Sequence, residues 1–149
     1  EATGRGNDYV NGRGEPLYPF GFGLSYTTFE YSPLKIDKTN YSVPNGNDTL
    51  AFSFLIQNTG QFDGAEAIQF YIKTNYSQES LPVQCLIDTK KITLKKGETM
   101  GFLAYKIPLS QLGIPTGPGS DAYPTQFQLQ IGSSSKDIRL QSPILFIEN

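Results

Sequence analysis

The chain of 149 residues contains no histidine, no tryptophan and a single cysteine. Without histidine it has no imidazole base for a Ser-His-Asp triad and no histidine ligand for a metal. One cysteine excludes an intrachain disulfide and a structural zinc site built from cysteines. We expect Cys85 to be a buried small side chain, with a reactive thiol or an interchain link as alternatives. The sequence predicts no metal and no cofactor.

An excess of basic charge is also lacking, since 12 Lys and Arg face 14 Asp and Glu and the net charge is −2. Nucleic acid and anionic lipid attract basic faces, so neither nucleic acid nor membrane is expected as a partner. The longest apolar run, residues 144–147, is far shorter than the ~20 residues that span a membrane. No leader is recognisable at Glu1, and the opening is rich in Gly, Asn and Arg. We therefore expect a piece of a longer protein.

Aromatic residues, glycine and proline are plentiful, with 9 Tyr, 10 Phe, 15 Gly and 10 Pro. This composition, together with alternating apolar and polar positions, predicts short strands joined by turns. The expected class is all-β, an immunoglobulin- or fibronectin type III-like antiparallel β-sandwich of about seven strands. One helical turn is expected at 109–112. Strands are expected at 29–36, 49–57, 66–73, 86–94, 99–107, 126–131, 137–140 and 144–147.

An aromatic segment precedes the first predicted strand, at residues 16–26. Its prolines and glycines exclude a helix, and its aromatic side chains do not alternate as in a strand. We therefore divide the chain into an irregular N-terminal extension, residues 1–28, and a sandwich, residues 29–149. The aromatic side chains are expected to pack across the flank of the sandwich or on a domain outside this sequence. These interdomain residues are Tyr18, Phe20, Phe22 and Tyr26.

Two carboxylates suffice for glycoside hydrolysis, and Asp63 with Glu66 is the most suggestive pair. Asp63-Gly64, however, follows Asn58-Thr59-Gly60 and is typical of a turn between two strands. Glu15 and Glu30 flank the aromatic segment, where an interface role is favoured over catalysis. We predict no catalytic residue in this chain.

Predicted loops contain tyrosines whose rings are candidates for stacking on a sugar, although the lack of tryptophan counts against a sugar platform. These tyrosines are Tyr41, Tyr76 and Tyr123. Three Asn-x-Ser/Thr sequons also lie in predicted loops and are candidate N-glycosylation sites. They begin at Asn40, Asn47 and Asn75.

The segment from Glu15 to Tyr31, EPLYPFGFGLSYTTFEY, resembles a signature of family 3 glycoside hydrolases, the β-glucosidases and β-xylosidases. In that family it lies where the catalytic part passes into a C-terminal fibronectin type III-like domain. Residues 58–66, 94–98 and 132–140 resemble further family turns and strands in the same order. Three features depart from the family pattern: Asp88-Thr89 replaces a Gly-Phe pair, Lys96 replaces a proline, and the loop between Leu112 and Thr125 differs from the family's tryptophan-containing stretch.

The resemblance implies a non-catalytic C-terminal accessory module that stabilises a parent enzyme by interdomain packing. The parent would be a retaining β-glucosidase or β-xylosidase, secreted, extracellular or periplasmic. The implied partners are its catalytic (β/α)8 barrel and α/β sandwich domains. The alternative is a module that binds carbohydrate or lignin and holds polymeric substrate near the catalytic domains. Nothing in this chain matches the regions that hold the family's catalytic residues, so this chain alone is not expected to be an enzyme.

Overall fold

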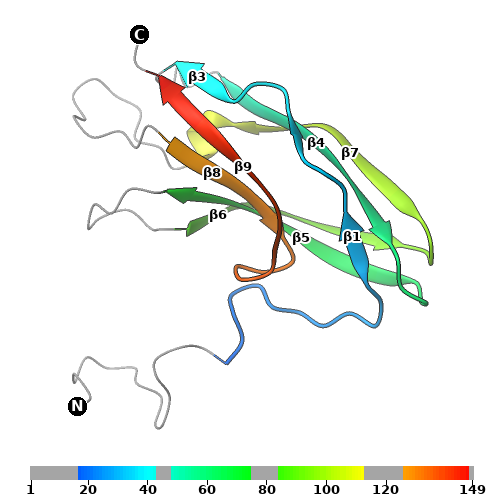
Figure 1. The fold of residues 1–149 in the computed structure, drawn as a ribbon. Helices are drawn as coiled ribbons and strands as arrows, with labels where there is room; N and C mark the ends of the chain where they lie inside the picture. The colour runs from blue at the N-terminus through cyan, green and yellow to red at the C-terminus, as the bar shows by residue number, and fades with distance from the viewer. Residues whose placement is uncertain (1–16, 43–47, 75–83, 113–125, 148–149) are drawn as a thin grey trace, which may run out of the picture.

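The computed structural model describes residues 17–42, 48–74, 84–112 and 126–147, which form two sheets (Figure 1). The first sheet contains β1 (Phe29–Tyr31), β2 (Lys35–Ile36), β4 (Thr49–Asn58) and β7 (Thr99–Pro108). The second contains β3 (Asn40–Ser42), β5 (Gly64–Thr74), β6 (Gln84–Leu94), β8 (Gln126–Gly132) and β9 (Ile138–Ile147).

Strand β4 is the centre of the first sheet. Strand β7 pairs along one of its edges, and β1 and β2 pair along the other edge, all antiparallel. The second sheet has the order β3-β9-β8-β5-β6 and is antiparallel except for the parallel pair of β3 and β9. Figure 1 shows the two sheets face to face, with the extension running past the β8–β9 loop before it enters β1. The predicted all-β sandwich is confirmed.

The described residues form nine strands rather than about seven, and proline explains two of the differences. The predicted strand at 29–36 is divided into β1 and β2 around Pro33, because proline cannot donate to a ladder. The two predicted strands at 137–140 and 144–147 are one strand, β9, which continues through Pro143. Strand β3 pairs only with Leu145–Ile147, so β9 has an open edge at Pro143, where proline is tolerated.

The inner faces of both sheets supply one apolar core. The apolar positions predicted to face the core in β4, β5 and β8 are confirmed, because their side chains are buried. The opposite faces are not fully exposed as predicted, since Gln69, Tyr71 and Gln130 are buried as well. The buried apolar residues of these strands are Leu50, Phe52, Phe54, Ile56, Ile68, Phe70, Ile72, Phe127, Leu129 and Ile131.

A bulge in the first sheet brings extra aromatic rings against this core. The register between β4 and β7 shifts between Phe52 and Phe54, and Ala104 has a positive φ of 50° in the opposite strand. As a result Phe102 and Tyr105, three positions apart, both pack on the core. The rings of Phe54 and Phe102 are stacked with centroids 4.8 Å apart.

The Tyr105 hydroxyl donates a hydrogen bond to Asp88, and both burial and this contact raise the pKa of Tyr105. Asp88 is one of the two residues that replace the family's Gly-Phe pair. In this chain its carboxylate therefore ties β6 to the aromatic cluster of the opposite sheet.

The prediction for Cys85 is wrong, because its side chain is exposed. Cys85 lies near the start of β6, which is the edge strand of its sheet and has a neighbour on one side only. The predicted helical turn is confirmed as η1 (Leu109–Leu112). Within the described ranges, no helix is long and apolar enough to cross a membrane.

Phe54→Ala is expected to lower the free energy of unfolding by about 3–5 kcal/mol, because it leaves a cavity between stacked rings. The matched control is Leu55→Ala, the next residue of β4, whose side chain is 44% exposed. It is expected to cost less than about 1 kcal/mol. Urea unfolding of both variants measures the difference, and equal losses would contradict the assigned faces of β4.

Candidate functional site

The extension is attached to the sandwich through its backbone. The carbonyl oxygen of Phe20 accepts a hydrogen bond from the Ser135 amide at 3.0 Å. The carbonyl oxygen of Gly21 accepts one from Gln69 Nε2 at 2.9 Å. A turn closed by a bond from Phe22 N to the Pro19 carbonyl, with Gly21 at φ +77°, presents these carbonyls to the sheet.

Gln69 on β5 is the residue that receives this turn. Its Nε2 also donates to the Ser133 carbonyl at 2.8 Å, and its Oε1 accepts from the Tyr71 hydroxyl. A Cβ at Gly21 would lie 2.0 Å from Gln69 Oε1, so only glycine permits this close approach. One buried amide therefore joins the extension and the β8–β9 loop to the outer side of β5.

A second buried amide, that of Asn58, holds the other end of the extension. Asn58 Oδ1 accepts from Thr27 Oγ1 at 2.6 Å and from the Gly60 amide at 3.1 Å. Its Nδ2 donates to the carbonyls of Phe62 at 2.8 Å and Leu94 at 3.1 Å. The side chain is fully buried, and both ends of its amide are satisfied.

The turns around Asn58 confirm the interpretation of Asp63. Asp63 Oδ1 accepts a hydrogen bond from the Lys96 amide at 2.8 Å, so its carboxylate closes the β4–β5 turn onto the β6–β7 turn. Proline, which the family usually has at this position, has no N–H to donate. Lys96 Nζ also donates to Gln61 at 2.7 Å.

Apolar side chains of the extension face away from the sandwich. We call this set the apolar face, and its members are 44% to 96% exposed: Leu17, Tyr18, Phe20, Phe22, Leu24 and Tyr26. The rings of Tyr18 and Phe22 stack on each other with centroids 5.0 Å apart. These side chains do not fill the core of the sandwich. Their role at a domain interface stays a prediction.

A polar cluster lies where the extension enters β1. Tyr31 Oη donates to Glu66 Oε1 at 3.0 Å. Arg139 binds Asp137 in a bidentate pair at 2.6 and 2.7 Å, and its Nη1 donates to the Phe29 carbonyl at 3.0 Å. Burial raises the pKa of the Glu66 carboxyl, whereas the bond to Arg139 lowers that of Asp137. The predicted carboxylate pair is thus divided, since Asp63 serves a turn and Glu66 is buried beside a tyrosine.

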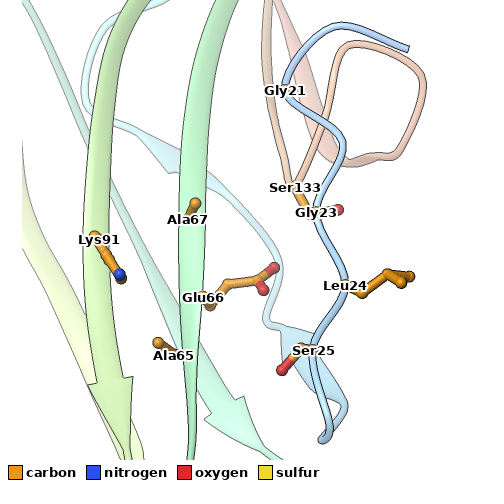
Figure 2. A pocket seen from close by; sticks show the side chains of 9 residues that line it. All are labelled: Gly21, Gly23, Leu24, Ser25, Ala65, Glu66, Ala67, Lys91 and Ser133. Atoms are coloured by element: carbon orange, nitrogen blue, oxygen red, sulfur yellow. The ribbon is translucent and has the colours of Figure 1, made fainter. Parts of the chain in front are cut away.

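A hollow of about 250 Å³ lies beside Glu66, between β5 and the extension. Figure 2 shows the residues that line it. Its walls include Gly21, Gly23 and Ser25 of the extension and Ala65 and Ala67 of β5. No group of three or more metal-ligating side chains is present in the described part of the chain.

The prediction that Tyr41 lies in a loop is wrong. Tyr41 is part of β3, which pairs with β9, and its side chain is 2% exposed. Its ring therefore has no open face for a sugar. Asn40 is exposed but lies in β3 rather than in a loop. Tyr76, Tyr123, Asn47 and Asn75 lie outside the described residues.

Sequence patterns did not single out Gln69, which alternates with apolar neighbours as a solvent-facing residue does. Asn58 is recognisable in the sequence only as part of a turn. The signal available for Asn58 is its place in residues 58–66, a segment that resembles the family.

No family model matches the chain. A β-xylosidase from Formosa agariphila is 36% identical over 134 residues, which are 89% of this chain and 18% of that protein. A periplasmic β-glucosidase from Salmonella typhimurium is 35% identical over 138 residues, 92% of this chain and 17% of that protein. The solved structure of a β-D-glucoside glucohydrolase from Trichoderma reesei matches with a TM-score of 0.72 and 30% identity. That match covers 89% of this chain and 20% of the other.

The fold and the apolar face define a β-sandwich that carries an attached, outward-facing extension. The chain matches one segment of family 3 β-glucosidases and β-xylosidases, as the sequence resemblance predicted. It spans about a fifth or less of the length of these relatives.

Gln69→Ala is expected to lower the free energy of unfolding by about 1–3 kcal/mol, because it removes two donated bonds and leaves the Tyr71 hydroxyl without its acceptor. Hydrogen exchange at the amides of Phe22 and Ser135 is expected to accelerate. Gln57→Ala, an exposed amide on β4, is the control and should change neither quantity. Unchanged protection of both amides in Gln69→Ala would show that this side chain does not hold the extension.

Glu66→Gln is expected to be more stable than the wild type at pH 7. Glu66 has a higher pKa in the folded chain than in the unfolded chain. Above the folded-state pKa the carboxylate is ionised in both states, and its burial lowers the stability of the fold. Below the unfolded-state pKa the carboxyl is neutral in both states, and this cost is absent. The advantage should therefore vanish as the pH falls to about 4. Thermal melts across this range measure it, with exposed Glu30→Gln as the control. A Glu66→Gln variant less stable than the wild type at pH 7 would contradict the assigned cost.

Proposed function

We propose that this chain is a non-catalytic accessory module that packs its apolar face against the catalytic part of a larger β-glucosidase or β-xylosidase. The partners are the (β/α)8 barrel and α/β sandwich domains that the resemblance implies. In this role the module stabilises the parent enzyme, in a periplasmic or extracellular setting such as the name of the Salmonella relative gives for that protein.

The observation that carries the proposal is the orientation of the extension. The main-chain carbonyls of Phe20 and Gly21 and the hydroxyl of Thr27 hold it, so its apolar side chains stay largely exposed. Aromatic side chains bury about 150–250 Å² each when covered, and contiguous exposed patches of this kind mark interaction surfaces. A few such rings provide the lower range of an interdomain interface, about 600 Å² and above.

The short span of the matched segment supports the same proposal. Relatives named for glycosidase activity are five to six times longer than their match to this chain, so most of each protein lies outside that match. The carboxylates of the suggestive pair have structural partners here, Lys96 for Asp63 and Tyr31 for Glu66. The carbohydrate-binding alternative loses one of its tyrosines, because Tyr41 is buried.

Phe20→Ser/Phe22→Ser is expected to abolish docking of this chain to the catalytic part of the parent enzyme. Interface aromatics are worth about 2 kcal/mol or more each, so the loss of two should raise the dissociation constant by about 1,000-fold. Titration calorimetry between the two separately produced parts measures it. Leu55→Ser, a partly exposed apolar residue on the first sheet, is the control and should dock normally.

The same double substitution is also expected to change the self-association of the isolated chain. The wild type should associate with itself as concentration rises, because its apolar face is uncovered, whereas the double variant should stay monomeric in light scattering. Its free energy of unfolding should change by no more than about 0.5 kcal/mol per substitution. Identical docking and identical scattering of wild type and variant would overturn the proposal.

A further inference from the structure

Strand β5 has an open edge beside the extension. On one side it pairs with β6 along its length from Gly64 to Lys73. On the other side β8 reaches it only from Gln69 onward. In an antiparallel sheet, alternate residues point their N–H and C=O groups to each side. Backbone groups between Gly64 and Ile68 therefore face the extension without a strand partner in the described part of the chain.

The extension runs along this edge without pairing to it. Figure 2 shows residues 21–25 passing beside β5 in the opposite direction. The segment touches the strand at both ends, through the bond from Gln69 to Gly21 and through Ser25 and Thr27 beside Gly64. Between these ends lies the hollow of about 250 Å³, and a Cβ at Gly23 would meet nothing within 4 Å. An open strand edge and a glycine backbone thus face each other across a gap.

The carboxylate of Glu66 lines the same gap. Its side chain is 9% exposed and points toward the extension in Figure 2. Among the described residues its hydrogen-bond partner is the neutral hydroxyl of Tyr31. The guanidinium of Arg139 is bidentate to Asp137 and lies near enough to Glu66 to lower the pKa of that carboxyl, although burial has the larger effect and raises it. A buried carboxylate is stabilised by further donors, and the hollow is the direction from which one can arrive.

We propose that the hollow is a binding site for a short extended peptide segment with an arginine, supplied by the catalytic part of the parent enzyme. The backbone of the segment pairs with the open edge of β5, as in strand addition, and its guanidinium donates to Glu66. This inference rests on the proposed function, because it names a second contact of the same module with the same partner.

The walls of the hollow favour a peptide over a sugar. Sugar sites are commonly built on an aromatic ring, and no aromatic side chain of the described residues lines this hollow. Ala65 and Ala67 on one wall and Gly21 and Gly23 on the other have small side chains or none, which leaves room for an extended chain beside their backbone.

The hollow is lined by one negative and one positive side chain, which should affect the binding of an arginine in opposite ways. Lys91 of β6 lies at the rim, on the far side of β5 from the extension. Its ammonium opposes an incoming guanidinium, whereas Glu66 attracts it. Removing each charge should therefore move the affinity in opposite directions.

The test is a titration of the ¹⁵N-labelled 149-residue chain with acetyl-Ala-Arg-Ala-amide, followed by NMR. The amides of Gly21, Gly23 and residues 65–67 are expected to shift, with a dissociation constant on the order of 1–10 mM. Acetyl-Ala-Gln-Ala-amide should bind about tenfold more weakly, and Glu66→Gln should weaken the arginine peptide by about tenfold. Lys91→Gln should tighten it about twofold.

Several results would overturn this inference. They are the absence of shifts at about 20 mM peptide, shifts confined to other surfaces, equal binding of the two peptides, or larger shifts of the same amides with methyl β-glucoside. The Phe20→Ser/Phe22→Ser variant separates this inference from the proposed function, since it should bind the peptide normally while failing to dock. If the double variant loses docking as expected but the chain does not bind the peptide, the peptide site is wrong and the proposed function stands.

Discussion

The buried amide of Asn58 is the contact on which the organisation of this end of the molecule depends. It ends β4, and its side chain binds the extension at Thr27, the β4–β5 turn at Phe62 and the end of β6 at Leu94. Its own backbone amide and carbonyl bond to Glu98 and Gly97 in the β6–β7 turn. Strand β4 belongs to one sheet and β6 to the other, so this single residue fixes how the two sheets meet. In a buried site such a network is strong when every member is satisfied.

The extension takes its position from this anchor and from Gln69. Between the two contacts the chain runs along the open edge of β5 without adding a strand to the sheet. Two consequences follow from one geometry. The apolar side chains remain outside, where another protein surface can cover them, and a gap remains beneath, where Glu66 is reached from the side of the extension.

Sequence reasoning was strongest where a period of two and a turn motif agreed. Strands β4, β5, β7 and β8 and the turn η1 were predicted close to their observed bounds, because their apolar faces fill the core. It failed where pairing decides the structure. Tyr41 belongs to a short strand whose parallel partner, β9, lies about a hundred positions along the chain.

The candidate site was predictable only in part, for a similar reason. The aromatic segment was recognisable by its composition, but the amide that holds it was not. Gln69 alternates with apolar residues along β5, which predicts a solvent-exposed side chain. It is buried because the extension covers it. Cys85 shows the converse, since cysteine is usually buried and here lies on an edge strand.

The attachment of the extension through main-chain carbonyls has a consequence for how the module can change. Phe20 and Gly21 offer oxygens that every residue type possesses, so only the glycine turn and the receiving amides restrict the sequence at this contact. The outward side chains can therefore be substituted without breaking the hydrogen bonds that hold the extension on the sandwich. A single scaffold of this kind is able to carry different surfaces, each matched to the domain it meets, while the fold beneath stays the same.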